Sequence, residues 1–466
     1  MRKPWLHFLW ALPALVILVF SVLYVISNIH GKAAWKKQVE TLAARGETLQ
    51  VKDLLGPAAA SEENVLLHPF WSSPELMDFL RTEAITQDAI LLLRSVPHPR
   101  TFDHSAALLA LLGEPSGNPA DDHAQLHALA ELRIAGWLDA YREAATRPYL
   151  DWNIDDQLNA AEAHARFGAL RQMGQAFCLV SLAALLDGKP DAALVWMQEA
   201  ERAFEFTIHS SIFETHLYLA AATQGPMIAV SAYGMEHGLW TPENLLELEQ
   251  IFSRIYLRKW MADGLRMERA VFVTNHLRST AEVLQNQLGL PSSPEGWDGY
   301  LLFGILALRP TGWDHEDRAL QAELYQKAID MLEDEALPTA IAEIRRFQPT
   351  AGHSPWSLVR HPMREKIGVQ NGQFALRMAY LETQIQMLRI AIALKLERAR
   401  TGVFPESLES LPLPEPSLAL DRFTGQPLNY RKDGDSYRLY STGPNGSDEN
   451  GKLQQQMHES PDWVFR

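Results

Sequence analysis

The segment that decides the fold runs from Phe374 to Leu408 and reads FALRMAYLETQIQMLRIAIALKLERARTGVFPESL. Its large apolar residues recur at steps of three or four, the spacing of one face of an α-helix. They are Phe374, Met378, Leu381, Ile385, Leu388, Ile392 and Leu396. Gly402 and Pro405 favour an end to the helix, because glycine tolerates a left-handed backbone and proline cannot continue the helical hydrogen bonds. We therefore expect a long amphipathic helix that ends near Gly402.

A β-hairpin is predicted after this helix. The segments 428–431 and 437–440 alternate apolar and polar residues around Asp433-Gly434, and an Asp-Gly pair between alternating segments is a strong hairpin signal. The side chains expected to face the long helix are those of Leu428, Tyr430, Tyr437 and Leu439. Residues 374–466 should thus form a small α+β module.

Upstream of residue 374 the pattern is helical and strand signals are scarce. The clearest helical hairpin covers Ala163 to Phe206 and turns at Asp187-Gly188-Lys189, and Thr241-Pro242-Glu243 is typical of a capped helix start. We expect a mainly α fold, an irregular array of helical hairpins. The expected divisions are a tail (1–7), a transmembrane helix (8–29), a juxtamembrane helical region with a long loop (30–125), a helical-hairpin domain (126–350), a linker (351–373) and the C-terminal module (374–466).

The stretch from Phe8 to Ile29 carries no formal charge. At about 1.5 Å per residue a helix of this length crosses a hydrocarbon core of about 30 Å. Trp5 and Trp10 fall at one expected interface and Trp35 lies beyond the other, as amphipathic rings prefer. A cleaved signal peptide is the alternative, but the apolar run is longer than its usual core. We expect an uncleaved, single-pass helix that binds the lipid bilayer.

The charges around this helix give two opposing indications of its orientation. Lys32, Lys36, Lys37 and Arg45 follow it, which favours a cytoplasmic C-terminal side. A short basic N-terminus before a first apolar segment is instead the usual arrangement of a signal anchor, which exports the part of the chain on its C-terminal side. We expect export, which places the bulk of the chain in the periplasm on the bacterial inner membrane.

Composition excludes some functions. The 466 residues carry 57 acidic and 42 basic side chains, a net charge of −15, which repels a phosphate backbone, so we expect no nucleic-acid partner. The one cysteine, Cys178, excludes an intramolecular disulfide and is interpreted as a small core residue.

Three short phrases resemble those of membrane-anchored proteins of planctomycete and verrucomicrobial bacteria whose activity is uncharacterised. They are Gly46-Glu47-Thr48-Leu49, the pair Glu63-Asn64 and Glu268-Arg269-Ala270. The resemblance implies a helix after the anchor that ends in the first phrase, followed by a turn before the second. This chain departs from the pattern at Pro57, which is followed by three alanines where several prolines are typical.

The last 80 or so residues resemble the globular part of major pseudopilins of type II secretion. The likeness lies in the order helix, Phe404-Pro405, the turn 421–425, the hairpin, and the loop from Tyr440 to Gly446. Arg422 stands where those proteins have proline, and the N-terminal entrance typical of a pseudopilin is missing. A filament-forming pseudopilin is therefore not expected.

In the pseudopilins the terminal loop binds calcium. Carried over, the resemblance implies that the ligands here are Ser441, Asn445, Ser447, Asp448 and Asn450, with Asp462 as a later ligand. Calcium accepts six to eight oxygen ligands, including neutral ones. The alternative is a solvated Gly-Asn-Asp turn without calcium.

His123 and His127 are four residues apart on an expected helix, so both imidazoles could face one metal ion. The sequence specifies no third ligand, and an exposed polar helix start is the alternative. No nucleophile motif or phosphate-binding glycine loop accompanies them. The function we expect is a membrane-anchored scaffold or binding element with an unknown protein partner. A metal-assisted envelope enzyme, or an accessory component of a secretion or pilus-like apparatus, is the alternative.

Overall fold

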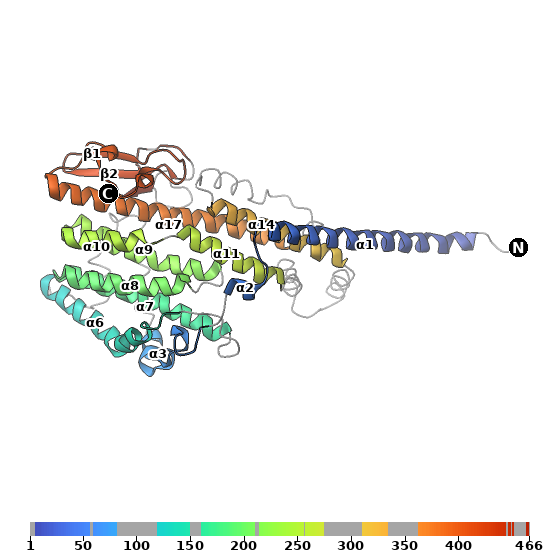
Figure 1. Ribbon diagram of the computed structural model, residues 1–466, viewed down its shortest axis with the longest axis horizontal. Helices are drawn as coiled ribbons and strands as arrows, with labels where there is room; N and C mark the ends of the chain where they lie inside the picture. Colours follow the sequence, from blue (N-terminus) through green and yellow to red (C-terminus); the bar gives the residue numbers. More distant parts are fainter. Residues whose placement is uncertain are drawn as a thin grey trace. The chain divides into compact units, whose positions relative to one another are not determined.

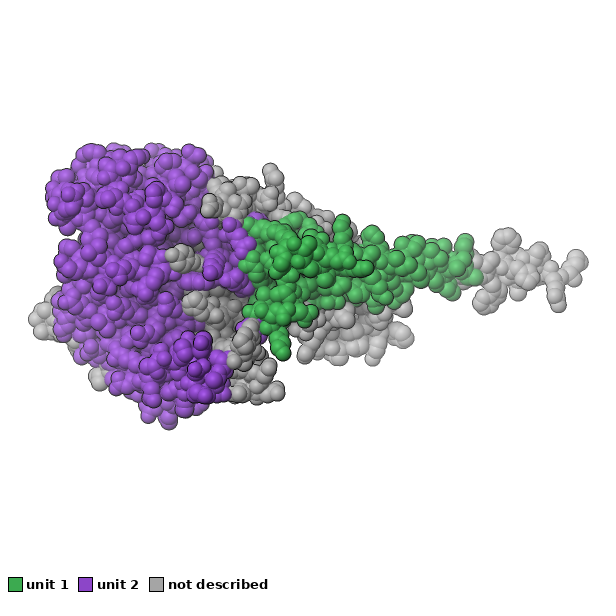
Figure 2. Space-filling model, viewed as in Figure 1, with its two compact units in different colours: residues 1–54, 265–330, 343–373 green, residues 55–264, 331–342, 374–466 purple. Residues whose placement is uncertain are grey.

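A computed structural model of the chain describes residues 5–55, 59–81, 119–149, 160–209, 214–255, 257–274, 310–333, 362–443, 446–448, 450–451 and 463–465. The protein divides into two compact units (Figure 2). Unit 1 comprises residues 1–54, 265–330 and 343–373, and unit 2 comprises residues 55–264, 331–342 and 374–466. Each unit thus combines segments that are distant in the sequence, whereas the predicted divisions follow one another along the chain.

The described residues are mainly helical, as predicted (Figure 1). The α-helices are α1 (Trp5–Ala44), α2 (Val51–Leu55), α3 (Pro74–Arg81), α6 (Pro119–Ala144), α7 (Ala160–Leu186), α8 (Pro190–His209), α9 (Glu214–Glu236), α10 (Pro242–Ser253), α11 (Leu257–Thr274), α14 (Thr311–Glu333) and α17 (Pro362–Thr401). Short 3-10 turns are η1 (Val65–Leu67), η2 (Pro69–Ser72), η3 (Leu408–Ser410) and η4 (Pro416–Ala419). The strands are β1 (Asn429–Asp433), β2 (Ser436–Ser441) and β3 (Trp463–Phe465). Residues 351–361 of the predicted linker lie outside the described residues.

The predicted membrane segment, Phe8 to Ile29, lies within α1. The large apolar side chains described between Leu15 and Ile29 are exposed, with Phe20 at 69%. Two helical segments are long and apolar enough to cross a membrane, Ile17–Ala44 and Gly168–Leu186, among the residues searched. In the second, 83% of the most apolar 18-residue stretch is buried, so it is interpreted as a core helix, whereas in the first only 6% of that stretch is buried. α1 is thus compatible with a membrane anchor or a signal sequence.

Within unit 1, α1 and the start of α14 approach closely at two glycines. A Cβ atom at Gly31 would fall on the backbone of Gly312, and one at Gly312 would fall on the backbone of Ser27. The Asn28 side-chain oxygen accepts hydrogen bonds from the Gly312 amide at 2.7 Å and the Thr311 hydroxyl at 3.1 Å. Asn28 therefore supplies a hydrogen-bond acceptor for the Gly312 N–H group, which has no partner within the first turn of α14.

Further along α1, apolar and charged contacts extend this packing. Leu42 packs with Val273 of α11 and Ala322 of α14 in a buried cluster, and the Arg318 guanidinium lies 4.5 Å from the centre of the Trp35 ring. Arg45 binds Asp330 through two hydrogen bonds of 2.6 and 3.1 Å. The end of α1 is therefore part of the folded unit.

Two of the phrases quoted above meet in unit 1. The Glu47 carboxylate accepts hydrogen bonds from Arg266 at 3.0 Å and from Arg269 at 2.7 Å. The Arg269 side chain is fully buried and also donates to the Gln326 amide oxygen of α14. Burial alone would raise the pKa of Glu47, but the two arginines more than offset it and lower that pKa. The residues of these phrases are therefore structural in unit 1.

In unit 2 the predicted helical hairpins are present. α7 and α8 are joined at Asp187 to Lys189, where Gly188 has a φ of 72°, and they pack against each other and against α9. Thr241 caps α10 in a capping box with Asn244, which confirms the predicted helix start. α6 packs on α7 through buried aromatic side chains that include Trp137, Tyr141 and Phe177.

The long helix α17 begins at Pro362, before the predicted start at Phe374. Proline is favoured at the first position of a helix, and the glycines at 368 and 372, which suggested a linker, lie inside it. The predicted end is correct: α17 stops at Thr401 and Gly402 has a φ of 83°. After this helix end, the chain turns back along α17. The Arg398 guanidinium lies 4.7 Å from the centre of the Phe404 ring and so holds the start of this turn against the helix.

The C-terminal hairpin is confirmed and lies along the C-terminal half of α17 (Figure 1). β1 and β2 pair antiparallel with Asp433 opposite Ser436, so the turn contains Gly434, whose φ is 61°. Of the four side chains predicted to face inward, Leu428, Tyr437 and Leu439 are buried, and half-buried Tyr430 donates its hydroxyl to the carbonyl of Pro405 at 2.8 Å. β3 adds a third strand beside β2, which the sequence did not indicate.

Candidate functional site

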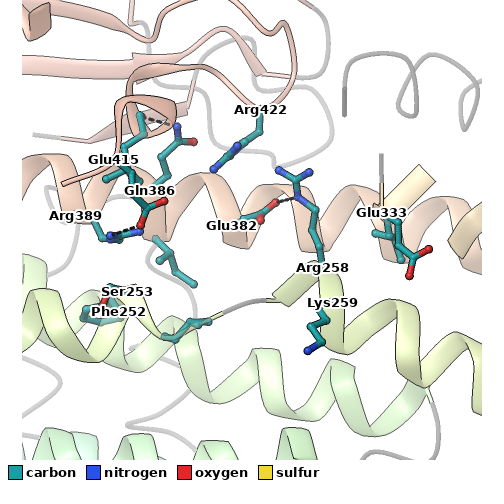
Figure 3. Close-up of a pocket in the computed structure, with 14 residues that line it drawn as sticks. Phe252, Ser253, Arg258, Lys259, Glu333, Glu382, Gln386, Arg389, Glu415 and Arg422 are labelled. Atoms are coloured by element: carbon teal, nitrogen blue, oxygen red, sulfur yellow. Dashed lines mark hydrogen bonds and ion pairs between the residues drawn. The ribbon is translucent and has the colours of Figure 1, made fainter. Parts of the chain in front are cut away.

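A cavity of about 390 Å³ lies within unit 2, between α17, the start of α11 and the C-terminal module (Figure 3). Its apolar lining residues are Phe252, Ile255, Leu332, Ile385 and Leu418. Its charged lining residues are Arg258, Lys259, Arg389, Arg422, Glu333, Glu382 and Glu415. The site therefore combines an apolar wall with a cluster of four cations and three carboxylates.

Two of the arginines are paired with carboxylates. Arg258 of α11 donates to Glu382 of α17 at 2.7 Å, and both side chains are less than one-fifth exposed. Arg389 donates to Glu249 of α10 at 2.9 Å and to Glu415 at 3.1 Å. These ion pairs connect three helices and the C-terminal module around the cavity.

Arg422 is the exception. It extends from the C-terminal module toward α17 (Figure 3), yet within the described part of the chain it has no hydrogen bond and no ion pair within 4 Å. Its Nε atom is buried and without a hydrogen-bond partner. Burial lowers the pKa of Arg422, and nearby Arg258 lowers it further, whereas Glu382 raises it. The cavity thus contains a cation whose loss of hydration is not offset by a bonded partner.

The backbone on both sides of Arg422 is fixed. The Gln386 amide of α17 donates to the carbonyls of Leu418 and Leu420 at 2.5 and 2.6 Å. The buried carboxylate of Asp421 accepts from the Phe423 amide at 2.8 Å and from the Thr442 amide at 3.1 Å. Arg422 is therefore presented from a turn held to both the long helix and the end of β2.

The structure places some of the predicted calcium ligands. Ser441 is buried and its hydroxyl accepts from the Gly443 amide at 3.0 Å. Asp448 accepts from the Tyr440 hydroxyl at 3.1 Å and from the Asn450 amide at 2.7 Å, and Asn450 has a φ of 62°. Ser447 is exposed, whereas Asn445 and Asp462 lie outside the described residues. The calcium site stays a prediction.

The two histidines considered as metal ligands both lie in α6, as expected, but only the His127 side chain is described. Its Nε2 atom lies 3.4 Å from Glu131 and its Nδ1 atom 3.3 Å from Asp187, so its two ring nitrogens face different carboxylates. Among the described residues, no group of three or more His, Cys, Asp or Glu side chains could hold a metal ion. Cys178 is fully buried, and burial raises the pKa of its thiol, as expected of a core cysteine.

Sequence reasoning missed the cavity because its charged residues come from segments far apart in the chain. Fold and site together describe a mainly helical protein with an N-terminal apolar helix and a charged cavity. Comparison of the chain with family models, with curated proteins and with solved structures found no match.

Proposed function

We propose that the protein is a single-pass, membrane-anchored binding element of the bacterial envelope. The observation that carries the proposal is that α1 has two parts. Its described large apolar side chains from Leu15 to Ile26 are exposed, whereas the helix packs within unit 1 from Ser27 onward. An exposed apolar helix of this length is unfavourable in water, and a bilayer removes that cost. The same helix would thus tether the folded chain to the membrane.

We further propose that the C-terminal side of α1 is exported to the periplasm. The support is the sequence pattern, a short basic N-terminus before a first apolar segment, which is usual for a signal anchor. The resemblance of three phrases to membrane-anchored bacterial proteins agrees with this location. The cavity in unit 2 favours a binding role over that of a plain scaffold, because it is a concave site with apolar walls and a few charged groups.

The membrane anchor is tested by placing charges at the centre of the apolar stretch. In the double variant Leu18→Lys and Val19→Lys, both altered side chains are exposed in the wild type, at 60% and 48%, so little packing within the protein is lost. A lysine at the centre of a spanning helix costs about 2.5–3.5 kcal/mol. We expect the wild type to resist carbonate extraction from membranes and the double variant to be extracted.

Val39→Lys is the matched control, because Val39 is also exposed on α1 but lies beyond the apolar stretch. It should remain in the membrane fraction. Extraction of the wild-type protein, or retention of the double variant at the wild-type level, would contradict an anchor formed by Phe8 to Ile29.

A further inference from the structure

One partly buried cation of the unit 2 cavity has no bonded partner among the described residues. Arg258 and Arg389 are satisfied by Glu382, Glu249 and Glu415, whereas Arg422 is bonded to none of the described residues. A buried charge without a partner is costly, and that cost falls when an anion reaches it. Arg422 is therefore the one arginine of the cavity that has no bonded carboxylate among the described residues.

The geometry of arginine restricts which anionic groups would pair well with Arg422. A planar guanidinium presents parallel N–H donors that match the two oxygens of a carboxylate or phosphate. The Arg422 turn is fixed by Gln386 and Asp421, so little ordering is required when an anion binds. The ligand should therefore present a planar or tetrahedral oxyanion to Arg422.

The carboxylates around the cavity favour a ligand that carries a single negative charge over one that carries two. Glu382 and Glu415 both act on Arg422 electrostatically, and they would repel the second charge of a phosphate. The cavity also has an apolar wall that includes Phe252, Ile385 and Leu418, and its volume of about 390 Å³ is at the small end of ligand sites. A small anion with one charge and an apolar part fits these features best.

We propose that this cavity binds a small organic monocarboxylate, whose carboxylate pairs with Arg422 and whose apolar part lies against Phe252, Ile385 and Leu418. The proposal goes beyond membrane anchoring and does not depend on it. It assigns a ligand class to the unit 2 cavity and a binding role to Arg422.

The test uses the detergent-solubilised full chain, with benzoate and inorganic phosphate as the probes in calorimetric titrations. We expect benzoate to bind more tightly than phosphate. Because a charged hydrogen bond contributes about 1.5–3 kcal/mol, Arg422→Gln should weaken benzoate binding by about tenfold or more. Arg431→Gln is the matched control, since Arg431 is an exposed arginine of the same module, and it should bind benzoate like the wild type.

Arg422→Lys is a second variant for the case that Arg422→Gln fails to fold. It keeps the positive charge of Arg422 but loses the forked arrangement of N–H donors, so it should bind benzoate less tightly than the wild type. Circular dichroism should show wild-type helix content for all three variants. The proposal is overturned if the wild type does not bind benzoate, if phosphate binds more tightly than benzoate, or if both Arg422 variants retain wild-type affinity.

Discussion

Glu47 and Arg269 form a buried ion pair that local sequence patterns do not predict, although the fold depends on it. They lie 222 residues apart, and the Arg269 side chain is fully buried against Glu47 and Gln326. Both belong to phrases that stand out in the sequence, but nothing in either phrase identifies the other as its partner. Removing one member of a buried ion pair leaves an uncompensated charge, so the pair is expected to matter more for stability than its surface neighbours.

Arg269→Ala should therefore be strongly destabilising. We expect a loss of about 3–5 kcal/mol in the free energy of unfolding, because Glu47 would lose its most buried partner. Arg266→Ala is the control: Arg266 bonds to the same carboxylate but is 19% exposed, so its loss should cost clearly less. Urea denaturation of the two variants measures the difference, and equal losses would contradict a dominant role for burial.

Glu201 of α8 gives a prediction about pH. Burial raises its pKa to about 7; Arg254, 3.5 Å away, lowers the pKa, whereas nearby Glu205 raises it further. Between pH 4.5 and 7 the folded protein holds a proton on Glu201 that the unfolded chain releases, so stability falls as pH rises through this range.

Glu201→Gln should remove that pH dependence. Thermal unfolding should show the variant to be more stable than the wild type at pH 8 and of similar stability at pH 4, where the carboxyl is protonated in both states. Glu247→Gln, on the exposed surface of α10, serves as the control. A Glu201 variant less stable than the wild type at pH 8 would mean that the ion pair with Arg254 outweighs the cost of burial.

At the scale of elements, sequence patterns predicted what local chemistry decides. The apolar stripe of α17, its end at Gly402, the capping box at Thr241 and the turn at Gly434 depend on residues a few positions apart. The start of α17 at Pro362 was missed because the prolines and glycines between residues 352 and 372 suggested a linker, although proline is favoured at a helix start and packing can hold glycines in a helix.

The candidate site could not be predicted in the same way. Arg258, Glu382 and Arg422 come together only when α11, α17 and the C-terminal module pack, and no periodicity connects these positions. The close approach of α1 and α14 is likewise a tertiary feature, since Gly31 and Gly312 are ordinary glycines in the sequence. Sequence reasoning thus reached the elements but not the contacts between distant ones.

Gly31→Ala tests the close approach of α1 and α14. Its new methyl group would fall on the Gly312 backbone, so the two helices would have to separate, with an expected loss of about 1–3 kcal/mol. Gly168→Ala is the control, because Gly168 is a helical glycine with no neighbouring atom within 4 Å of a Cβ. It should raise stability by about 0.4–1 kcal/mol. Thermal unfolding that shows Gly31→Ala to be as stable as the wild type would contradict the contact.

At the scale of the whole molecule, the chain passes more than once through each of its two compact units. The first segment of unit 1 contains the apolar helix, and unit 2 contains the cavity and the C-terminal module. A protein built in this way can be tethered at one end and bind a ligand elsewhere. The central claim is that α1 tethers it and that the remainder lies outside the cytoplasm.

The most direct measurement of that claim uses one added cysteine. The native Cys178 is fully buried and its thiol pKa is raised, so it should not react while the protein is folded. Ser436→Cys places a thiol at an exposed position of the hairpin. We predict that a membrane-impermeant maleimide labels this variant in intact spheroplasts and leaves the wild type unlabelled. Labelling of the variant only after the membrane is permeabilised would contradict the claim.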